Sequence, residues 1–309
     1  MALQNSFDLA KKQAEGANLS SGYTMEDGRF YNAYLTNEEW DSFRSEMEKD
    51  YPIAFHNYKD GDGGEIEEKQ YPPKMASYGS SSRFIYKLSR DIPGFEFEKK
   101  LGICVPARNE NTEAKASLDG YLESKTIFVE AKCREIYSES HPEFNEKYRA
   151  FYNFLSEGTG GDFQFDLKES VNKKGEIKRR VYFSWAGKPI SHLDLKQLLC
   201  HMLGIGKKSL NEGGKNTPTL LYLVYRPTDK VLSFINSKRT VNSIMRCREI
   251  EENEASSIID TKLLYKLAVR FLHEIKNVNA SLSPDEVERI SNDFVFKFCD
   301  QEEYLQILR

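Results

Sequence analysis

The stretch ASLDGYLESKTIFVEAKCRE, residues Ala116–Glu135, decides how the rest of the chain is interpreted. It predicts a β-hairpin, because the polar turn Glu123-Ser124-Lys125 separates two strand-like runs, 117–122 and 126–134. The second run carries the β-branched and aromatic residues that favour strands. A turn centred on Ser124-Lys125 places residues whose numbers add up to 249 opposite each other, and this register sets which side chains share a face.

The predicted hairpin has two different faces, because side chains alternate along a strand. One face carries small and apolar residues: Leu118, Gly120, Leu122, Ile127, Val129 and Ala131. The other face carries Asp119 directly opposite Glu130, with Lys132 two residues further along. Facing carboxylates repel each other, so the arrangement needs a cation. The alternative interpretation is an amphipathic hairpin with a solvated polar face.

A hard divalent metal would supply that cation. Oxygen ligands with room left for water suit Mg²⁺, for which Mn²⁺ can substitute, and a lysine nearby can position a metal-bound water or stabilise a developing phosphate charge. The facing register and the apolar reverse face favour this interpretation over the solvated hairpin. We therefore predict a metal site at Asp119 and Glu130.

These residues also resemble a known motif. Leu118-Asp119-Gly120 followed by Val129-Glu130-Ala131-Lys132 is similar to the core of the PD-(D/E)xK nuclease superfamily, the restriction-endonuclease-like fold, with Leu118 in place of the usual proline. Three stretches also resemble a bacterial family of such proteins of about this length. They are PPKMASYGSSSR (Pro72–Arg83), FEFEKKL (Phe95–Leu101) and FVEAKC (Phe128–Cys133).

The resemblance implies a function and a set of roles. It implies Mg²⁺-dependent hydrolysis of phosphodiester bonds, in which Asp119, Glu130 and the carbonyl of Ala131 hold the metal and Lys132 is the catalytic lysine. It also makes Glu98 the candidate for a third metal ligand, although glutamates on the surface of a first strand are common. Gln197 matches a helix glutamine that approaches the active site in several branches of the superfamily; the alternative is a polar residue on the helix surface.

Composition bounds the class of protein. The chain has 309 residues, 39% of them hydrophobic and 30% charged, which fits one large domain or one domain with additions. No apolar run reaches membrane-spanning length, and MALQNSFDLAKKQ lacks the pattern of a signal peptide, so we expect a cytoplasmic protein without a membrane partner. The five cysteines are scattered without CxxC spacing, which indicates reduced core residues and no zinc site.

Charge is distributed unevenly along the chain. Residues 26–70 hold thirteen acidic and five basic side chains, a net charge of −8, whereas residues 164–215 hold five acidic and eleven basic side chains, a net charge of +6. FQFDLKES and RRVYFSW predict two strands of a basic hairpin that could grip backbone phosphates or form a solvated loop tip. Its candidate nucleic-acid-binding residues are Lys173, Lys174, Lys178, Arg179 and Arg180.

Together these patterns predict an α/β fold in which a restriction-endonuclease-like core with a mixed central sheet is flanked by helices. Residues 1–72 are expected to form an acidic, helical N-terminal segment, 73–230 the nuclease core with a basic insertion at about 136–190, and 231–309 an all-helical segment. Within the core, the helix 191–204 is expected to end at Gly204. The C-terminal helices either pack against the sheet or form the surface of a homodimer.

The expected activity is that of a metal-dependent endonuclease acting on double-stranded DNA, in restriction or another form of defence. A DNA-repair nuclease or a junction resolvase is the nearest alternative, and substrate structure would separate the two. The rival from another class is a non-catalytic module that binds nucleic acid or protein on the same fold. The presence of Asp119, Glu130 and Lys132 together argues against a site that has lost its activity.

Overall fold

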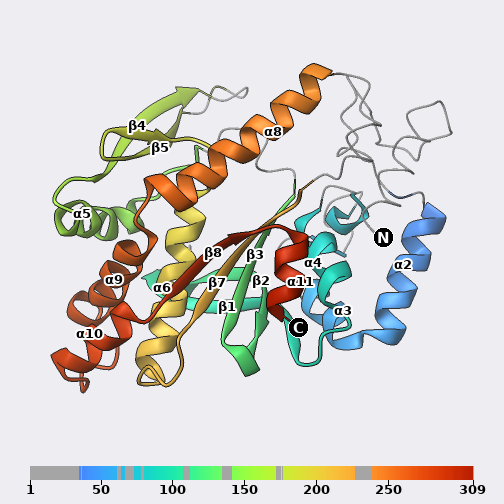
Figure 1. The fold of residues 1–309 in the computed structure, drawn as a ribbon, viewed down its shortest axis with the longest axis horizontal. Coiled ribbons are helices and arrows are strands. Elements are labelled where there is room, and N and C mark those ends of the chain that lie inside the picture. The colour runs from blue at the N-terminus through green and yellow to red at the C-terminus, as the bar shows by residue number, and fades with distance from the viewer. Residues whose placement is uncertain are drawn as a thin grey trace.

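A mixed sheet with helices on both faces forms the centre of the molecule (Figure 1). The computed structural model describes residues 35, 37–60, 64–66, 73–77, 80–106, 112–133, 141–171, 175, 177–226 and 238–308. Five strands in that part of the chain form the central sheet, in the order β1-β2-β3-β7-β8. Their bounds are β1 Phe95–Pro106, β2 Glu113–Leu122, β3 Ile127–Lys132, β7 Thr219–Val224 and β8 Val295–Cys299.

The sheet is mixed in direction. β1, β2 and β3 are antiparallel, whereas β7 is parallel to β3 and β8 is parallel to β7. Residues of β7 from Leu220 to Val224 are at most 1% exposed, as expected for a parallel strand covered on both faces. The predicted α/β class with a mixed central sheet flanked by helices is therefore confirmed.

The hairpin of β2 and β3 has the predicted register. Gly120 pairs with Val129, Tyr121 with Phe128, and Leu122 with Ile127. The turn is a short 3₁₀ helix, η3 (Glu123–Lys125), followed by Thr126 at a φ of 53°. Glu123-Ser124-Lys125 therefore reverses the chain as its polarity indicated.

One expectation about this hairpin is wrong. Leu118 was expected on the same face as Leu122, but it packs in the cluster that contains Tyr121 and Phe128, while Leu122 and Val129 pack on the opposite side of the sheet. The faces therefore exchange within β2, between Leu118 and Leu122. The neighbouring strand β1 makes the same exchange, because Phe97 packs on one side and Leu101 on the other. Strict alternation fails where a strand is kinked.

Helices from both ends of the chain cover one face of the sheet: α2 (Asn37–Asp50), α3 (Pro52–Lys59), α4 (Ser81–Ser89) and α11 (Gln301–Leu308), with the short 3₁₀ helix η2 (Lys74–Ala76). Their apolar side chains include Phe43, Tyr86 and Tyr304, which share one cluster with Val129 and Leu221 of the sheet. The Ser80 hydroxyl accepts a hydrogen bond from the Arg83 amide at 3.2 Å and so caps the beginning of α4, as serines before a helix commonly do.

The other face is covered by α6 (Leu195–Asn211), with α8 (Lys238–Asn253), α9 (Thr261–Arg270) and α10 (Pro284–Asn292) around it. Two π-helical segments, Glu254–Ile258 and Phe271–Ile275, precede and follow α9. The expected end of the helix at Gly204 is wrong, because α6 continues to Asn211. A Cβ atom at Gly204 would lie 2.8 Å from the Cβ of Leu101, so this glycine allows α6 to approach β1 rather than ending the helix.

The insertion forms a second, smaller sheet. After η5 (Glu146–Tyr148) and α5 (Arg149–Gly158) come β4 (Phe163–Val171), β5 (Ile177–Trp185) and the short β6 (Lys188–Ile190), in the order β4-β5-β6. Both predicted strands of the basic hairpin are thus confirmed. Figure 1 shows this sheet apart from the central one, beside α8.

The C-terminal segment is not all-helical, which corrects a third expectation about the fold. A capping box at Ser283 begins α10, but that helix ends at Asn292, and Val295–Cys299 forms the edge strand β8. Phe294 and Phe298 are four residues apart, a spacing that also suits a helix, but they flank and occupy this strand. Five residues are too few for periodicity to separate strand from helix, and pairing with β7 decides the outcome. None of the helices in the described ranges is long and apolar enough to cross a membrane.

Candidate functional site

The polar face of the hairpin is buried under α6. Glu130 is 2% exposed and Lys132 is 7% exposed, so the interpretation of this face as a solvated surface is wrong. Both residues lie on β3, the central strand between β2 and β7. Buried charges are stable only when they are paired and hydrogen-bonded, and the partners of this pair come from α6.

Four side chains form one network at this place. The Lys132 ammonium contacts Glu130 Oε1 at 2.8 Å and donates a hydrogen bond to Gln197 Oε1 at 2.5 Å. The second carboxylate oxygen, Glu130 Oε2, lies 2.9 Å from His201 Nε2. Gln197 and His201 are four residues apart on α6 and therefore lie on one face of that helix. Gln197 is thus a partner of Lys132 rather than a residue of the helix surface.

Asp119 lies where β2 and β3 separate. The backbone pairing of the two strands ends at Gly120 and Val129, one pair before Asp119 and Glu130. At that point Asp119 Oδ2 accepts the amide hydrogen of Ala131 at 2.7 Å. The Asp119 carboxylate therefore accepts a hydrogen bond that a backbone carbonyl would otherwise accept. This bond fixes Asp119 beside Glu130 and Lys132, the two neighbours of Ala131 in the chain.

The pKa values of the carboxyl groups are moved far apart. Burial, followed by the charges of Glu130 and Glu98, raises the pKa of Asp119 well above its ordinary value. Burial alone would also raise the pKa of Glu130, but the neighbouring Lys132 and His201 lower it to about 2. Glu130 is therefore ionised, while Asp119 retains a proton to higher pH than an exposed aspartate would.

Glu98 belongs to the same electrostatic group. It lies on β1 at a φ of 55°, at the point where that strand exchanges faces. Burial raises its pKa to about 7, and the charges of Glu65 and Glu130 contribute to the rise. The sequence-predicted third carboxylate is thus close enough to Glu130 for their charges to interact, although no hydrogen bond joins them in the described residues.

Two site residues were missed by sequence reasoning. His201 could have been found as the second polar residue on the face of α6 that carries Gln197. Glu65 belongs to the acidic N-terminal segment, whose folding onto the core no local pattern indicates. It is 7% exposed, and its Oε2 atom has no hydrogen-bond partner among the described residues.

The donor set fits a hard divalent cation in its chemistry. Glu130 raises the pKa values of both Asp119 and Glu98, so these carboxylates form a set of oxygen ligands to which Mg²⁺ or Mn²⁺ would add positive charge. The groups that would hold it are Asp119, Glu130, the Ala131 carbonyl and Glu98. Within the described residues, no three His, Cys, Asp or Glu side chains already converge as a metal-binding group.

The basic hairpin belongs to the second sheet. Lys178, Arg179 and Arg180 lie on β5, whereas Lys173 and Lys174 lie outside the described residues. Lys178 contacts Glu143 at 2.8 Å, and Arg179 lies 3.6 Å from Glu169. Three of the five predicted nucleic-acid-binding residues are thus placed on one strand, with acidic neighbours.

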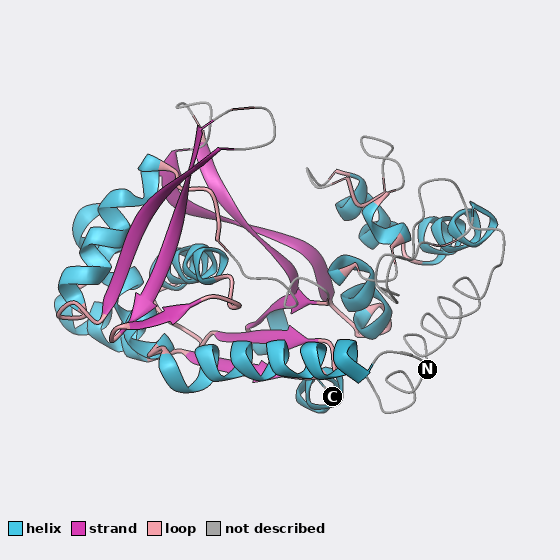
Figure 2. Cartoon of the chain, turned by 90° about the horizontal axis from the view of Figure 1, so that it is seen from above, coloured by secondary structure: helices cyan, strands magenta, loops and turns pink. Residues whose placement is uncertain are grey.

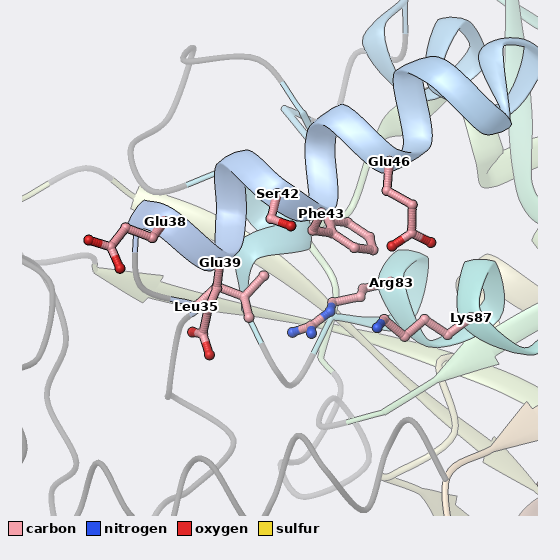
Figure 3. Close-up of a pocket in the computed structure, with 8 residues that line it drawn as sticks. All are labelled: Leu35, Glu38, Glu39, Ser42, Phe43, Glu46, Arg83 and Lys87. Atoms are coloured by element: carbon pink, nitrogen blue, oxygen red, sulfur yellow. The ribbon is translucent and has the colours of Figure 1, made fainter.

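A pocket lies away from these residues, between α2 and α4 (Figure 3). Glu46 of α2 points toward the two cations of α4, whereas Glu38 points away from them (Figure 3), and the Arg83 guanidinium and the Lys87 ammonium each lie 5.4 Å from the centre of the Phe43 ring. Burial, with Arg83 and Arg90 nearby, lowers the pKa of Lys87 to about 8. The lining contains no predicted site residue: Leu35, Glu38, Glu39, Ser42, Phe43, Glu46, Arg83 and Lys87.

The chain was compared with models of protein families, with curated proteins and with solved structures, and none of the three comparisons found a match.

Proposed function

We propose that this protein is a divalent-metal-dependent nuclease that cuts DNA. The observation that carries the proposal is the buried Lys132, whose ammonium is held between Glu130 and Gln197 beside Asp119. Burying a lysine is costly, and three residues identified by the sequence motif contact or adjoin it. A cation fixed next to carboxylates is what hydrolysis of a phosphodiester requires.

The order of the elements supports the same proposal. A helix, three antiparallel strands, a second helix and a parallel strand follow one another as α4, β1, β2, β3, α6 and β7. This is the order that the resemblance to restriction-endonuclease-like proteins implies. Fold alone does not fix activity, so the site residues carry the argument.

Each side chain has a role in the proposed reaction. Asp119, Glu130 and the Ala131 carbonyl would hold the metal, which, when bound, would polarise the phosphate and acidify water. The Lys132 ammonium would orient the attacking water and stabilise negative charge on the phosphate. Gln197 holds that ammonium in place, and His201 fixes the second oxygen of Glu130. His201 and Gln197 are positioning residues in this account.

The test is cleavage of supercoiled plasmid and linear duplex by the full chain with Mg²⁺, Mn²⁺ or EDTA. We expect cutting with either metal, none with EDTA, and a loss of at least about a hundredfold in Asp119→Ala and Lys132→Ala. Lys115→Ala is the matched control, because Lys115 is an exposed cation on the same strand as Asp119. A Lys132→Ala protein that cuts as well as the wild type would refute the proposed site.

A second candidate function is a module on this fold that binds nucleic acid or protein without turnover. Both carboxylate oxygens of Glu130 are already held, by Lys132 and by His201, which favours this candidate. Calorimetric titration with Mn²⁺ separates the two functions. A folded protein that neither binds Mn²⁺ nor cuts duplex, single-stranded, branched or RNA substrates would support the module.

A further inference from the structure

Two apolar side chains are exposed at the far end of the β4–β5 hairpin. Val171 and Ile177 are paired opposite each other in its last rung, with 69% and 67% of their surfaces exposed. They lie on the face that carries Phe163, Val181 and other buried side chains nearer the body of the protein. The hairpin reaches beyond α5 (Figure 1) and beyond the helices when seen from above (Figure 2), so this end lies past the packed part of its own face.

The opposite face of the same end is cationic. Lys168 and Arg180 are directly opposed in the pairing of β4 with β5, and both are exposed. Like charges opposed across strands destabilise the pair, so the position favours an anion that neutralises both. Lys168 lies 4.4 Å from the centre of the Tyr182 ring, and Arg180 donates to the backbone carbonyl of His141 at 2.9 Å. Neither of these two contacts supplies a negative charge; the acidic Glu143, which pairs with Arg180 along the backbone, contacts Lys178 at 2.8 Å.

We propose that this end of the hairpin is a duplex-DNA probe, in which Val171 and Ile177 enter a groove and Lys168 and Arg180 contact the flanking phosphates. The inference rests on the proposed function, since it names the part of the protein that would hold the duplex. A β-ribbon can dock in the minor groove, and aliphatic side chains that enter the minor groove unstack base steps. The opposed cations favour DNA over an uncharged protein surface.

Binding without cleavage tests the probe directly. The full chain is titrated in EDTA with a duplex that carries 2-aminopurine at successive positions, and fluorescence reports unstacking of the bases. In the wild type we expect binding with increased fluorescence. In the double variant Val171→Ser/Ile177→Ser we expect the increase to disappear and the affinity to fall about tenfold, while the salt dependence stays the same.

The cations are tested by their effect on salt dependence. Lys168→Gln/Arg180→Gln removes two expected phosphate contacts, so the slope of log affinity against log salt should fall by about 2. Ile53→Ser is the matched control for the apolar pair, because Ile53 is 76% exposed on α3, outside the second sheet. The affinity of Ile53→Ser for the duplex and the fluorescence increase on binding should equal those of the wild type.

The outcomes separate this inference from the proposed function. If the wild type cuts DNA, but Val171→Ser/Ile177→Ser binds the duplex and unstacks its bases as well as the wild type does, the probe is wrong and the proposed nuclease function stands. If the wild type binds with increased fluorescence that Val171→Ser/Ile177→Ser lacks, but never cuts with Mn²⁺, the probe stands and the nuclease is wrong. If no duplex is bound, and the double variant instead changes self-association or vesicle binding, the probe is wrong and the apolar pair serves a protein or lipid surface.

Discussion

At the residue scale, the charges of Glu130 and Lys132 depend on each other inside the protein. Lys132→Met would leave Glu130 buried with His201 alone, so we expect the free energy of unfolding to fall by about 3–5 kcal/mol. Glu130→Gln/Lys132→Met should recover most of that loss, because neither charge then remains. Urea denaturation at 25 °C measures the free energy of unfolding of both variants, and Lys115→Met is the control at an exposed site. A double variant as unstable as Lys132→Met would contradict the pairing.

Glu98 links stability to pH. Its pKa is raised to about 7 in the folded protein from an ordinary value of about 4.5, so between those values the folded state keeps a proton that the unfolded state has lost. The contribution of Glu98 therefore falls as pH rises through this window and is constant above it. Glu98→Gln should lack this fall. The stability of the variant relative to the wild type should rise between about pH 4.5 and pH 7, measured by urea denaturation without divalent metal. A constant difference would contradict the raised pKa.

The sequence identified four residues of the candidate site but missed two others, Glu65 and His201. Asp119, Glu130, Lys132 and Gln197 follow from motif and spacing, because their positions are local to one hairpin and one helix. Glu65 could not be found in this way, since its place depends on how the acidic N-terminal segment packs. The exchange of faces at Leu118 was also missed, because strict alternation is the only guide that a sequence offers.

At the element scale, the beginning of α6 depends on one carboxylate from a distant segment. Glu254 is 2% exposed and accepts hydrogen bonds from the amides of Ser191, His192 and Leu193. Glu254→Ala should lower the free energy of unfolding by about 3 kcal/mol or more, because three charge-assisted bonds are lost. Hydrogen exchange of the Ser191–Leu193 amides should become faster. The exposed Glu252→Ala is the control, and equal effects in both variants would contradict this role.

Elements with a long periodic pattern were predicted best. The helix of α6 and the hairpin of β2 and β3 follow from regular spacing and turn chemistry. The strand β8 did not, because its five residues form a strand only through pairing with β7. The length of α6 was underestimated at Gly204, where the glycine serves a close contact with Leu101 that is invisible in the sequence.

At the scale of the whole molecule, a helix that precedes the central sheet in sequence is joined to the last described helix. The hydroxyl groups of Ser89 on α4 and Tyr304 on α11 form a buried hydrogen bond of 2.6 Å, although 215 residues separate them. Tyr304→Phe should lower the free energy of unfolding by about 1–2 kcal/mol, since the Ser89 hydroxyl loses its partner. Tyr51→Phe, which removes an exposed hydrogen bond to Asp91, should change it little. Equal changes in the free energy of unfolding in the two variants would show that the buried hydrogen bond contributes no more to stability than the exposed one.

The hairpin of β4 and β5 has a consequence for how such a protein can vary. Its near end is fixed by packing at Phe163 and Trp185, whereas Val171 and Ile177 at the far end are not. Adding or removing one residue in each strand would change its reach by about 3.4 Å and turn its faces over, but two residues in each would keep the faces and change the reach by about 7 Å. The hydrogen bond from Lys132 on β3 to Gln197 on α6 joins the two elements between which the whole insertion lies. Reach can therefore be lengthened or shortened in fixed steps while the network around Lys132 stays in place.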